Sequence, residues 1–184
     1  MIFNCDFETT DLVHAGVSDF LAQPGIVQIG VTILNDKYDE VSSWKTLVNP
    51  EQVRSQWSES AIRVHGITPE MVEDAPTFFA VFDQFAGHAA GCDTWTGYNT
   101  KFDKDVLWFQ LLRYGFERSF AWPRHDLDAM KLAKDFMAIQ GKRGVKPPKL
   151  IEIYEHLFPG ESFDAHDALE DVRASARVLK ELKK

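Results

Sequence analysis

The fold is decided at residues 2–11, which read IFNCDFETTD. The short, apolar beginning of this stretch, over residues 2–7, predicts a β-strand that ends at Asp6-Phe7-Glu8. Because side chains alternate along a strand, Asp6 and Glu8 leave one face of the sheet, and the other face turns Phe3, Cys5 and Phe7 toward the core. Two such acids, taken alone, are typical of a solvated strand edge. This strand is apolar enough to be central, however, and ligand sites of α/β sheets gather at the carboxyl ends of their strands.

The rest of the chain alternates strands with helices. Residues 26–34 are rich in β-branched side chains and predict a second strand, which a short polar turn joins to a third at 41–48 as a hairpin. A further strand is expected at 93–98. Apolar spacing predicts helices that open at 58 and 68, and others over 77–90, 99–114, 126–138, 148–157 and 167–182. This order predicts one α/β domain over residues 1–184, with a mixed central sheet flanked by helices.

The bulk composition excludes several classes of protein. Hydrophobic residues make up 45% of the chain and charged residues 26%, as in ordinary globular domains. No stretch has the length of a membrane span and the N-terminus lacks the basic region of a signal peptide, so we expect a cytoplasmic protein without a membrane partner. The net charge of −8 argues against a protein that grips long duplexes, but it leaves metal-dependent nuclease chemistry open. Cys5 and Cys92 lack zinc-ligand spacing, and we expect both to be small buried side chains.

Two later segments also carry acids. Asp103 falls in the first turn of a predicted helix, where the helix dipole favours an acid in any case. His166 directly precedes the last predicted helix, and Asp171 lies on the first turns of that helix. A histidine in such a position is commonly structural. Glu170 faces away from Asp171 by roughly 100°, the rotation per residue of a helix, and is interpreted as a surface acid.

Taken together, these segments supply four hard oxygen ligands and one imidazole. Carboxylates of this kind suit Mg²⁺ or Mn²⁺ better than zinc. Two such ions, roughly 4 Å apart, can activate a water and stabilise the leaving oxygen of a phosphodiester. A neutral histidine can take the proton from that water at physiological pH. Two-metal hydrolysis of a phosphodiester therefore requires this set of residue types, and the sequence holds the set in three separated places.

Three motifs, in order along the chain, resemble those of the DEDD exonucleases, histidine subclass (DEDDh), which include the epsilon proofreading subunit and ribonuclease T. The motifs are Asp6-x-Glu8-Thr9-Thr10, Asn99-x-x-Phe102-Asp103 and His166-x-Ala168-x-x-Asp171. Residues 26–30 (IVQIG) and 64–68 (VHGIT) also resemble segments of this family. The resemblance covers residues 2–179 and implies a ribonuclease-H-like fold. It further implies release of nucleoside 5′-monophosphates from a 3′ end.

The resemblance also implies roles for individual residues. One metal ion is expected on Asp6, Glu8 and Asp171, and a second on Asp6 and Asp103, with His166 as the general base. Leu12 resembles the residue that wedges against the terminal base, and His65 and Phe102 resemble residues that line its pocket. The backbone from Phe7 to Thr9 resembles the part that meets the terminal 3′-hydroxyl. Leu12, His65 and Phe102 could equally be ordinary packing residues.

The chain departs from the family pattern at one position. The family usually has glycine where this chain has Asp11, and glycine would permit a tight approach to the substrate. Asp11 adds a Cβ and a charge, and the loop from Val13 to Pro24 is longer than the tight loop of the family. We therefore expect the catalytic residues to be kept, and the departure leaves the choice of substrate open.

The leading hypothesis is a metal-dependent 3′→5′ exonuclease that acts on single-stranded or frayed 3′ ends. Contacts to the 2′ position decide between DNA and RNA, and the sequence leaves that choice open. The alternative is a catalytically inactive family member that binds nucleic acid or a polymerase, against which the complete ligand set argues. The chain ends soon after the last predicted helix, so we expect a free-standing enzyme or a noncovalent polymerase partner, with the oligomeric state open. The basic run at 142–149 is interpreted as a solvated loop or as a loop that steers phosphate.

Overall fold

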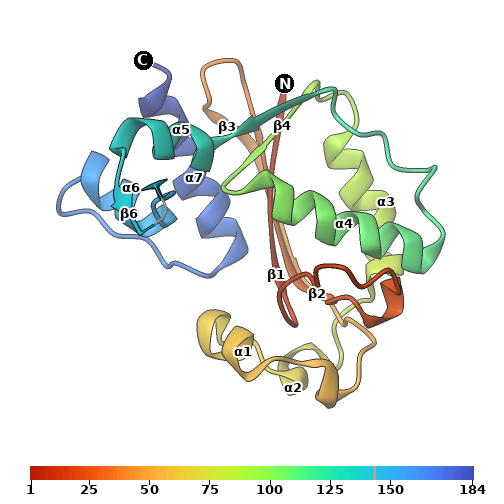
Figure 1. The fold of residues 1–184 in the computed structure, drawn as a ribbon. Helices are drawn as coiled ribbons and strands as arrows, with labels where there is room; N and C mark the ends of the chain where they lie inside the picture. The colour runs from red at the N-terminus through yellow and green to blue at the C-terminus, as the bar shows by residue number, and fades with distance from the viewer. Residues whose placement is uncertain (143) are drawn as a thin grey trace.

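The centre of the molecule is a five-stranded sheet with the order β3-β2-β1-β4-β5 (Figure 1). The structure is a computed structural model that describes residues 1–142 and 144–184. The strands are β1 (Ile2–Thr9), β2 (Ile26–Leu34), β3 (Glu40–Leu47), β4 (Thr94–Gly97) and β5 (His125–Asp128). β1, β2 and β3 pair antiparallel, whereas β4 and β5 continue the sheet in parallel. The predicted mixed sheet, its β2–β3 hairpin and the central place of β1 are thus confirmed.

Helices cover both faces of this sheet. They are α1 (Glu59–His65), α2 (Pro69–Val72), α3 (Phe78–Ala89), α4 (Thr100–Tyr114), α5 (Ala129–Met137), α6 (Leu150–Leu157) and α7 (Ala168–Leu182), with short 3-10 turns η1 (Phe20–Ala22) and η2 (Arg54–Gln56). In Figure 1, α5, α6 and α7 lie on one side of the sheet, and α3 and α4 lie on the other. The short helices α1 and α2 lie beyond the end of the sheet toward which β1 runs.

The alternation predicted for β1 anchors it in the main core. Phe3 and Cys5 are fully buried, and Phe7 is 3% exposed. Phe3 packs edge-on against Phe85 of α3 and Trp95 of β4, with ring centroids 5.7 and 4.9 Å apart. This packing fixes β1 from the α3–α4 side, so that the side chains of its other face are directed toward α7.

The sequence prediction was wrong in the region before α5. We predicted a helix from residue 126, but His125–Asp128 forms β5, which pairs in parallel with β4 over its whole length. The segment is short and largely charged, and its strand character comes from hydrogen bonds to a distant neighbour that no local pattern reveals. α6 likewise begins at Leu150 rather than at Pro148.

Two smaller expectations are also corrected. The basic run contains β7 (Gly144–Val145), which pairs with β6 (Gln140–Gly141) just before the run, and its Arg143 lies outside the described residues. Cys5 is buried as predicted, whereas Cys92 is partly exposed.

No helix in the described part of the chain has the length and apolar character that crossing a lipid bilayer requires.

Candidate active site

The carboxyl end of β1 lies beside the first turn of α4. β4 pairs with β1 only over Ile2–Asn4, so on this side the later part of β1 has α4 rather than a strand next to it. The backbone N–H of Phe7 accordingly donates to Oδ1 of Asp103 over 3.3 Å. Asp103 is 1% exposed, and its Oδ2 finds no hydrogen-bond partner among the described residues. Asp6 and Glu8, on the opposite face of β1 from Phe7, share this end of the sheet with Asp103.

Asp128 holds the start of α4 in place, a role that sequence reasoning missed. Asn99, directly before α4, has a φ of 71°, a left-handed conformation that asparagine tolerates better than most residues. Its N–H donates to Oδ1 of Asp128 at 3.1 Å, and the same oxygen accepts the N–H of Met130 at 2.9 Å. Asp128 is 5% exposed. An acid at the end of a strand was the available signal, but the strand itself had been assigned to a helix.

The start of α7 is anchored to the neighbouring strands. Asp167 caps the helix through the N–H groups of Leu169 and Glu170, and its other oxygen pairs with Lys45 of β3 at 2.8 Å. The N–H of Ala168 donates to the buried Gln28 of β2 at 2.8 Å. Sequence reasoning missed Lys45 and Gln28, because both act on α7 across more than a hundred residues of chain. Their contacts fix where the helix begins relative to β1.

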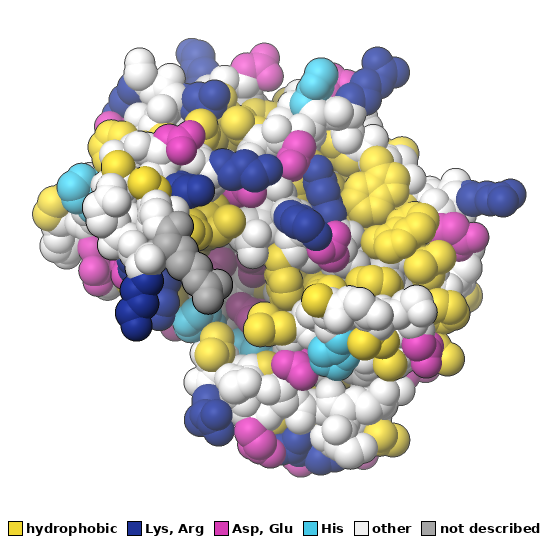
Figure 2. Space-filling model, in the orientation of Figure 1, with side chains coloured by type: hydrophobic (Ala, Val, Ile, Leu, Met, Phe, Trp, Pro, Cys, Tyr) yellow, Lys and Arg dark blue, Asp and Glu magenta, His cyan; other side chains and the backbone are white. Residues whose placement is uncertain are grey.

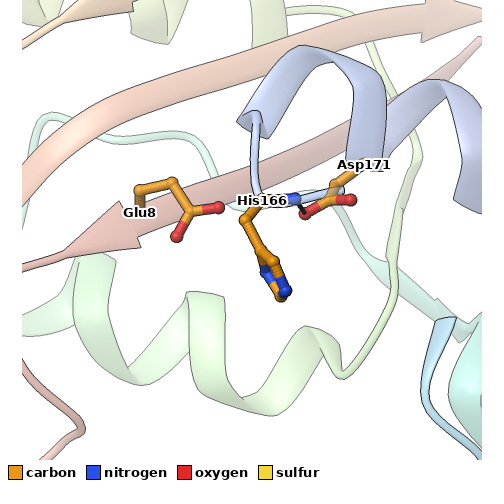
Figure 3. A group of neighbouring side chains, drawn as sticks. All are labelled: Glu8, His166 and Asp171. Carbon is orange, nitrogen blue, oxygen red and sulfur yellow. Dashed lines mark hydrogen bonds between the residues drawn. The ribbon is translucent and has the colours of Figure 1, made fainter. Parts of the chain in front are cut away.

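His166 and Asp171 are joined directly. His166 has a φ of 72°, a conformation that costs energy for a residue with a Cβ, and its backbone N–H donates to Oδ2 of Asp171 at 3.1 Å. Figure 3 shows Glu8 on β1 and the other two residues at the start of α7, with this hydrogen bond drawn as a dashed line. Ligand atoms of Glu8, His166 and Asp171 all lie within 4.8 Å of one another.

The four acids interact strongly at this end of the sheet. Burial, and then the nearby Asp103 and Glu8, raises the pKa of Asp6 well above its ordinary value. Burial also raises the pKa of Asp103, against the opposing hydrogen bond from Phe7. Burial followed by the charge of Asp171 raises the pKa of Glu8 to about 8, and burial raises the pKa of Asp171 to about 7. Poorly solvated carboxylates that repel one another make a site that favours cations.

A pocket of about 260 Å³ opens next to this cluster. Its lining includes all five residues predicted to meet a terminal nucleotide, namely Phe7, Thr9, Leu12, His65 and Phe102, together with Glu8 and Asp11. Figure 2 shows Asp, Glu and His side chains in the hollow at the centre of this face, with hydrophobic side chains along its rim. The structure thus brings the predicted catalytic and substrate-binding residues to one place.

His65 lines the pocket in a single hydrogen-bonded state. Its Nδ1 accepts the N–H of Ile67 at 3.0 Å, so the neutral ring carries its proton on Nε2, which donates to the carbonyl of Thr9 at 3.1 Å. Burial lowers the pKa of His65 and favours this neutral form. His65 therefore ties α1 to the end of β1.

Glu170 lies outside the cluster, as predicted. It accepts a hydrogen bond from Arg173 at 2.9 Å on the surface of α7.

Within the described part of the basic run, Lys146 approaches Glu152 at 3.8 Å. Tyr98, next to Asn99, donates to the carbonyl of Pro148 at 2.7 Å, which places the end of this run beside the start of α4.

Comparison with known proteins gives one family. The model of the exonuclease family RNase_T matches residues 4–179. A protein of Mycobacterium tuberculosis described as a bifunctional exonuclease/endonuclease is 31% identical over 141 residues. The match covers 76% of this chain and 20% of that protein, so the chain spans about a fifth of the length of this curated relative.

Solved structures with the same fold include several nucleases. Exonuclease X in complex with 5′ overhanging duplex DNA is 24% identical, with a TM-score of 0.67 over 99% of this chain and 90% of that one. The nuclease domain of 3′hExo, a DEDDh family member bound to rAMP, is 21% identical, with a TM-score of 0.70 over 99% and 90%. Escherichia coli exonuclease I with a bound oligonucleotide is 16% identical, with a TM-score of 0.77 over 99% and 40%. The fold is therefore the ribonuclease-H-like α/β fold.

Proposed function

Because the chain belongs to the exonuclease family RNase_T, we propose that it is a divalent-metal-dependent 3′→5′ exonuclease of the DEDD type, histidine subclass. It removes nucleoside 5′-monophosphates one at a time from single-stranded or frayed 3′ ends. The observation that carries this proposal is the meeting of Glu8, His166 and Asp171, within 4.8 Å of one another, beside a pocket that is open to solvent. Asp103 accepts a hydrogen bond from the backbone N–H of Phe7, the residue directly before Glu8.

The donor set fits Mg²⁺ or Mn²⁺. Carboxylate oxygens are the ligands that these hard cations prefer. Oδ2 of Asp103 is buried without a partner among the described residues, and the pKa of each of the four acids is raised, as expected of groups that need a positive charge nearby. We assign one ion to Asp6, Glu8 and Asp171, and a second to Asp6 and Asp103. Such ions, when bound, supply Lewis-acid activation of water and neutralise charge on the phosphate.

His166 is proposed as the general base. Its ring lies next to Glu8 and Asp171, and the residue is exposed to solvent, so it can take a proton from the attacking water and release it to bulk. The hydrogen bond from its backbone to Asp171 keeps the base in a fixed place relative to a metal ligand. The left-handed backbone at His166 costs conformational energy, and a role in placing the base explains why the fold keeps it.

The pocket supports attack at a strand end rather than within a strand. Its volume of about 260 Å³ is that of a small ligand site, and its apolar walls include Leu12, Val64 and Phe102. A space of this size suits a single nucleotide, and on this proposal a paired terminus frays before its last nucleotide enters. The net charge of −8 gives little affinity for long duplexes, which also favours single-stranded DNA or RNA ends.

The test is a time course with single-stranded DNA and RNA oligonucleotides that carry a fluorophore at the 5′ end. We expect a ladder that shortens by one nucleotide at a time in Mg²⁺ or Mn²⁺ and that disappears in EDTA. Release of a labelled mononucleotide at the earliest times would instead show attack from the 5′ end.

A matched pair of variants tests whether the hydrolysis depends on the acidic cluster. Asp171→Asn should abolish the ladder, whereas Glu170→Gln, one residue away on the same helix turn but paired with Arg173, should leave it unchanged. Equal loss of activity in both variants, or in neither, would contradict the assignment of Asp171.

A further inference from the structure

Asp11 places a second carboxylate in the pocket beside Glu8. The described residues around this pocket are mainly apolar where it lies away from Glu8, with Leu12, Val64 and Phe102 among them. Glu8 belongs to the cluster assigned to metal binding. Asp11 follows it by three residues, so the Cα atoms of the two residues lie at most about 10 Å apart. Asp11 is thus a charged group in a pocket whose lining includes several apolar side chains.

The carboxylate of Asp11 is held in one orientation. Its Oδ1 accepts the N–H of Leu12 at 2.8 Å, and its Oδ2 lies 3.2 Å from Nε2 of His14. The other ring nitrogen of His14 lies 2.9 Å from the carbonyl oxygen of Ala22. Both neighbours of the ring are hydrogen-bond acceptors. The contacts to Leu12 and His14 hold the Asp11 carboxylate in a fixed orientation.

The loop that carries this pair is built around a buried side chain. Gln23 is 1% exposed, and its amide group accepts the N–H of His14 at 2.9 Å while it donates to the carbonyls of His14 and Val17 at 3.0 and 2.7 Å. Gln52 in turn donates to the carbonyl of Gln23 at 2.9 Å. Asp11 is consequently part of an ordered, internally bonded structure and differs in this from a free surface acid.

Other polar groups that line the pocket have partners already. Thr9 donates its hydroxyl hydrogen to the carbonyl of Asp11 at 2.8 Å, both ring nitrogens of His65 are engaged, and the hydroxyl of Ser60 pairs with that of Ser58 at 2.6 Å. A carboxylate offers about four acceptor sites, of which Leu12 and His14 take two. Its side chain is 35% exposed, so the remaining sites of Asp11 are open to a bound molecule.

We propose that Asp11 selects the base of the 3′-terminal nucleotide and favours bases with an exocyclic amino group over thymine or uracil. This inference rests on the proposed function. The amino groups of adenine, cytosine and guanine donate to a carboxylate, and guanine offers two adjacent donors. Thymine and uracil present one N–H between two carbonyl oxygens, which a carboxylate repels. Asp11 is therefore a specificity-determining residue of the pocket.

The experiment compares oligonucleotides that differ only in the last nucleotide, and it measures kcat/KM for the first excision. The wild type should remove terminal thymidine about five- to tenfold more slowly than the other three nucleotides, the factor expected for a partly exposed hydrogen bond to a charged acceptor. Asp11→Asn keeps the shape and the contact to Leu12 but replaces one acceptor with a donor. In that variant the preference should fall to within about twofold or reverse toward thymidine.

A control on the same loop separates selection from general damage. Asp19→Asn removes an equal charge at the exposed cap of η1, outside the pocket, and should keep the wild-type preference. A merely structural role of Asp11 would slow all four substrates equally. The proposal is overturned by a wild type without terminal-base preference, by a preference that survives in Asp11→Asn, or by one that is lost equally in Asp19→Asn.

A binding measurement keeps this inference distinct from the proposed function. Calorimetric titration with each of the four deoxynucleoside 5′-monophosphates, in the presence of Mg²⁺, reports the pocket without turnover. We expect weaker binding of thymidine monophosphate in the wild type and loss of that difference in Asp11→Asn. Failure of hydrolysis with discrimination intact would refute the proposed activity alone, whereas equal binding of all four would refute the role of Asp11.

Discussion

Gly30 of β2 lies so close to Ala168, the first residue of α7, that a Cβ on it would stand 2.2 Å from both the carbonyl carbon and the carbonyl oxygen of Ala168. Gly30 is also the register partner of Asp6 in the β1–β2 ladder. The missing side chain therefore lets the helix that carries Asp171 approach the strand that carries Asp6. Close packing of backbone on backbone at this point sets the spacing of the acidic cluster.

Replacing Gly30 with alanine should separate α7 from the sheet. Because the obstructing atoms belong to the backbone, we expect Gly30→Ala to lower the free energy of unfolding by at least about 2 kcal/mol and to abolish activity. Gly87→Ala is the matched control, since nothing lies within 4 Å of its added Cβ in the exposed part of α3. It should stabilise the protein by about 0.5–1 kcal/mol. Urea denaturation measures both, and an unharmed Gly30→Ala would contradict the close approach.

We expect Asp103→Asn to lower the activity and to raise the stability of the metal-free protein. The variant keeps an oxygen that accepts the N–H of Phe7. It removes a buried acid whose pKa is raised by burial. We expect at least about a hundredfold lower kcat/KM, more than the usual loss for an outer partner of a metal site. Without metal and above neutral pH, the variant should be more stable than the wild type by about 1 kcal/mol. A variant that is both active and unchanged in stability would remove Asp103 from the metal site.

His166→Asn isolates the imidazole from the strained backbone around it. Asparagine tolerates the left-handed conformation at this position better than alanine does, so the loop should keep its shape. We expect the rate at neutral pH to fall by about 10²- to 10⁴-fold and to recover partly at higher pH, as hydroxide replaces the missing base. The shift of melting temperature on adding Mn²⁺ should persist. A variant with an unchanged rate at neutral pH would exclude His166 as the base.

The metal-free protein should lose stability as the pH rises. Glu8 and Asp171 have pKa values of about 8 and about 7 in the folded protein, whereas such groups titrate near about 4 in an unfolded chain. The folded state therefore holds protons that the unfolded state has released. The stability from these protons is complete below about pH 4 and is lost as the pH rises through about 7 and 8.

A melting series in EDTA from about pH 5.5 to about pH 8.5 tests this sign, and we expect a falling melting temperature. Saturating Mn²⁺ should reduce the fall, because cations stabilise the ionised carboxylates. Surface acids with lowered pKa values, such as Asp39, Glu40 and Glu161, act in the opposite direction but only at lower pH. A melting temperature that rises with pH in EDTA would contradict the raised values.

The sequence predicted β1 and its two acids well, because the alternation of apolar and acidic residues is a local pattern. Phe3 and Cys5 are buried as the period of a strand requires. β5 could not be predicted in the same way. Its four residues are held by pairing with β4, a contact that depends on the assembled sheet. The role of Asp128 was missed for the same reason. Its carboxylate accepts the N–H of Asn99, which lies 29 residues earlier in the chain.

The loop after β1 shows a second limit. The sequence marked Asp11 as a departure from the family pattern but could not show what the longer loop does with it. The answer depends on His14, whose ring contacts Asp11, and on the buried Gln23, which bonds to the backbone of His14 in the folded loop. Gly30 carries a similar lesson, because only the position of α7 reveals why a side chain is excluded there.

The most direct test of the central claim is the identity of the first product in heavy-oxygen water. A single-stranded oligonucleotide is incubated with the protein and Mg²⁺, and the earliest released molecule is examined by mass spectrometry. Attack of water on the terminal phosphodiester, with the proton taken by His166, predicts a nucleoside 5′-monophosphate from the 3′ end that carries one heavy oxygen on its phosphate. Internal fragments, or nucleosides with a 3′-phosphate, as the first products would contradict the account.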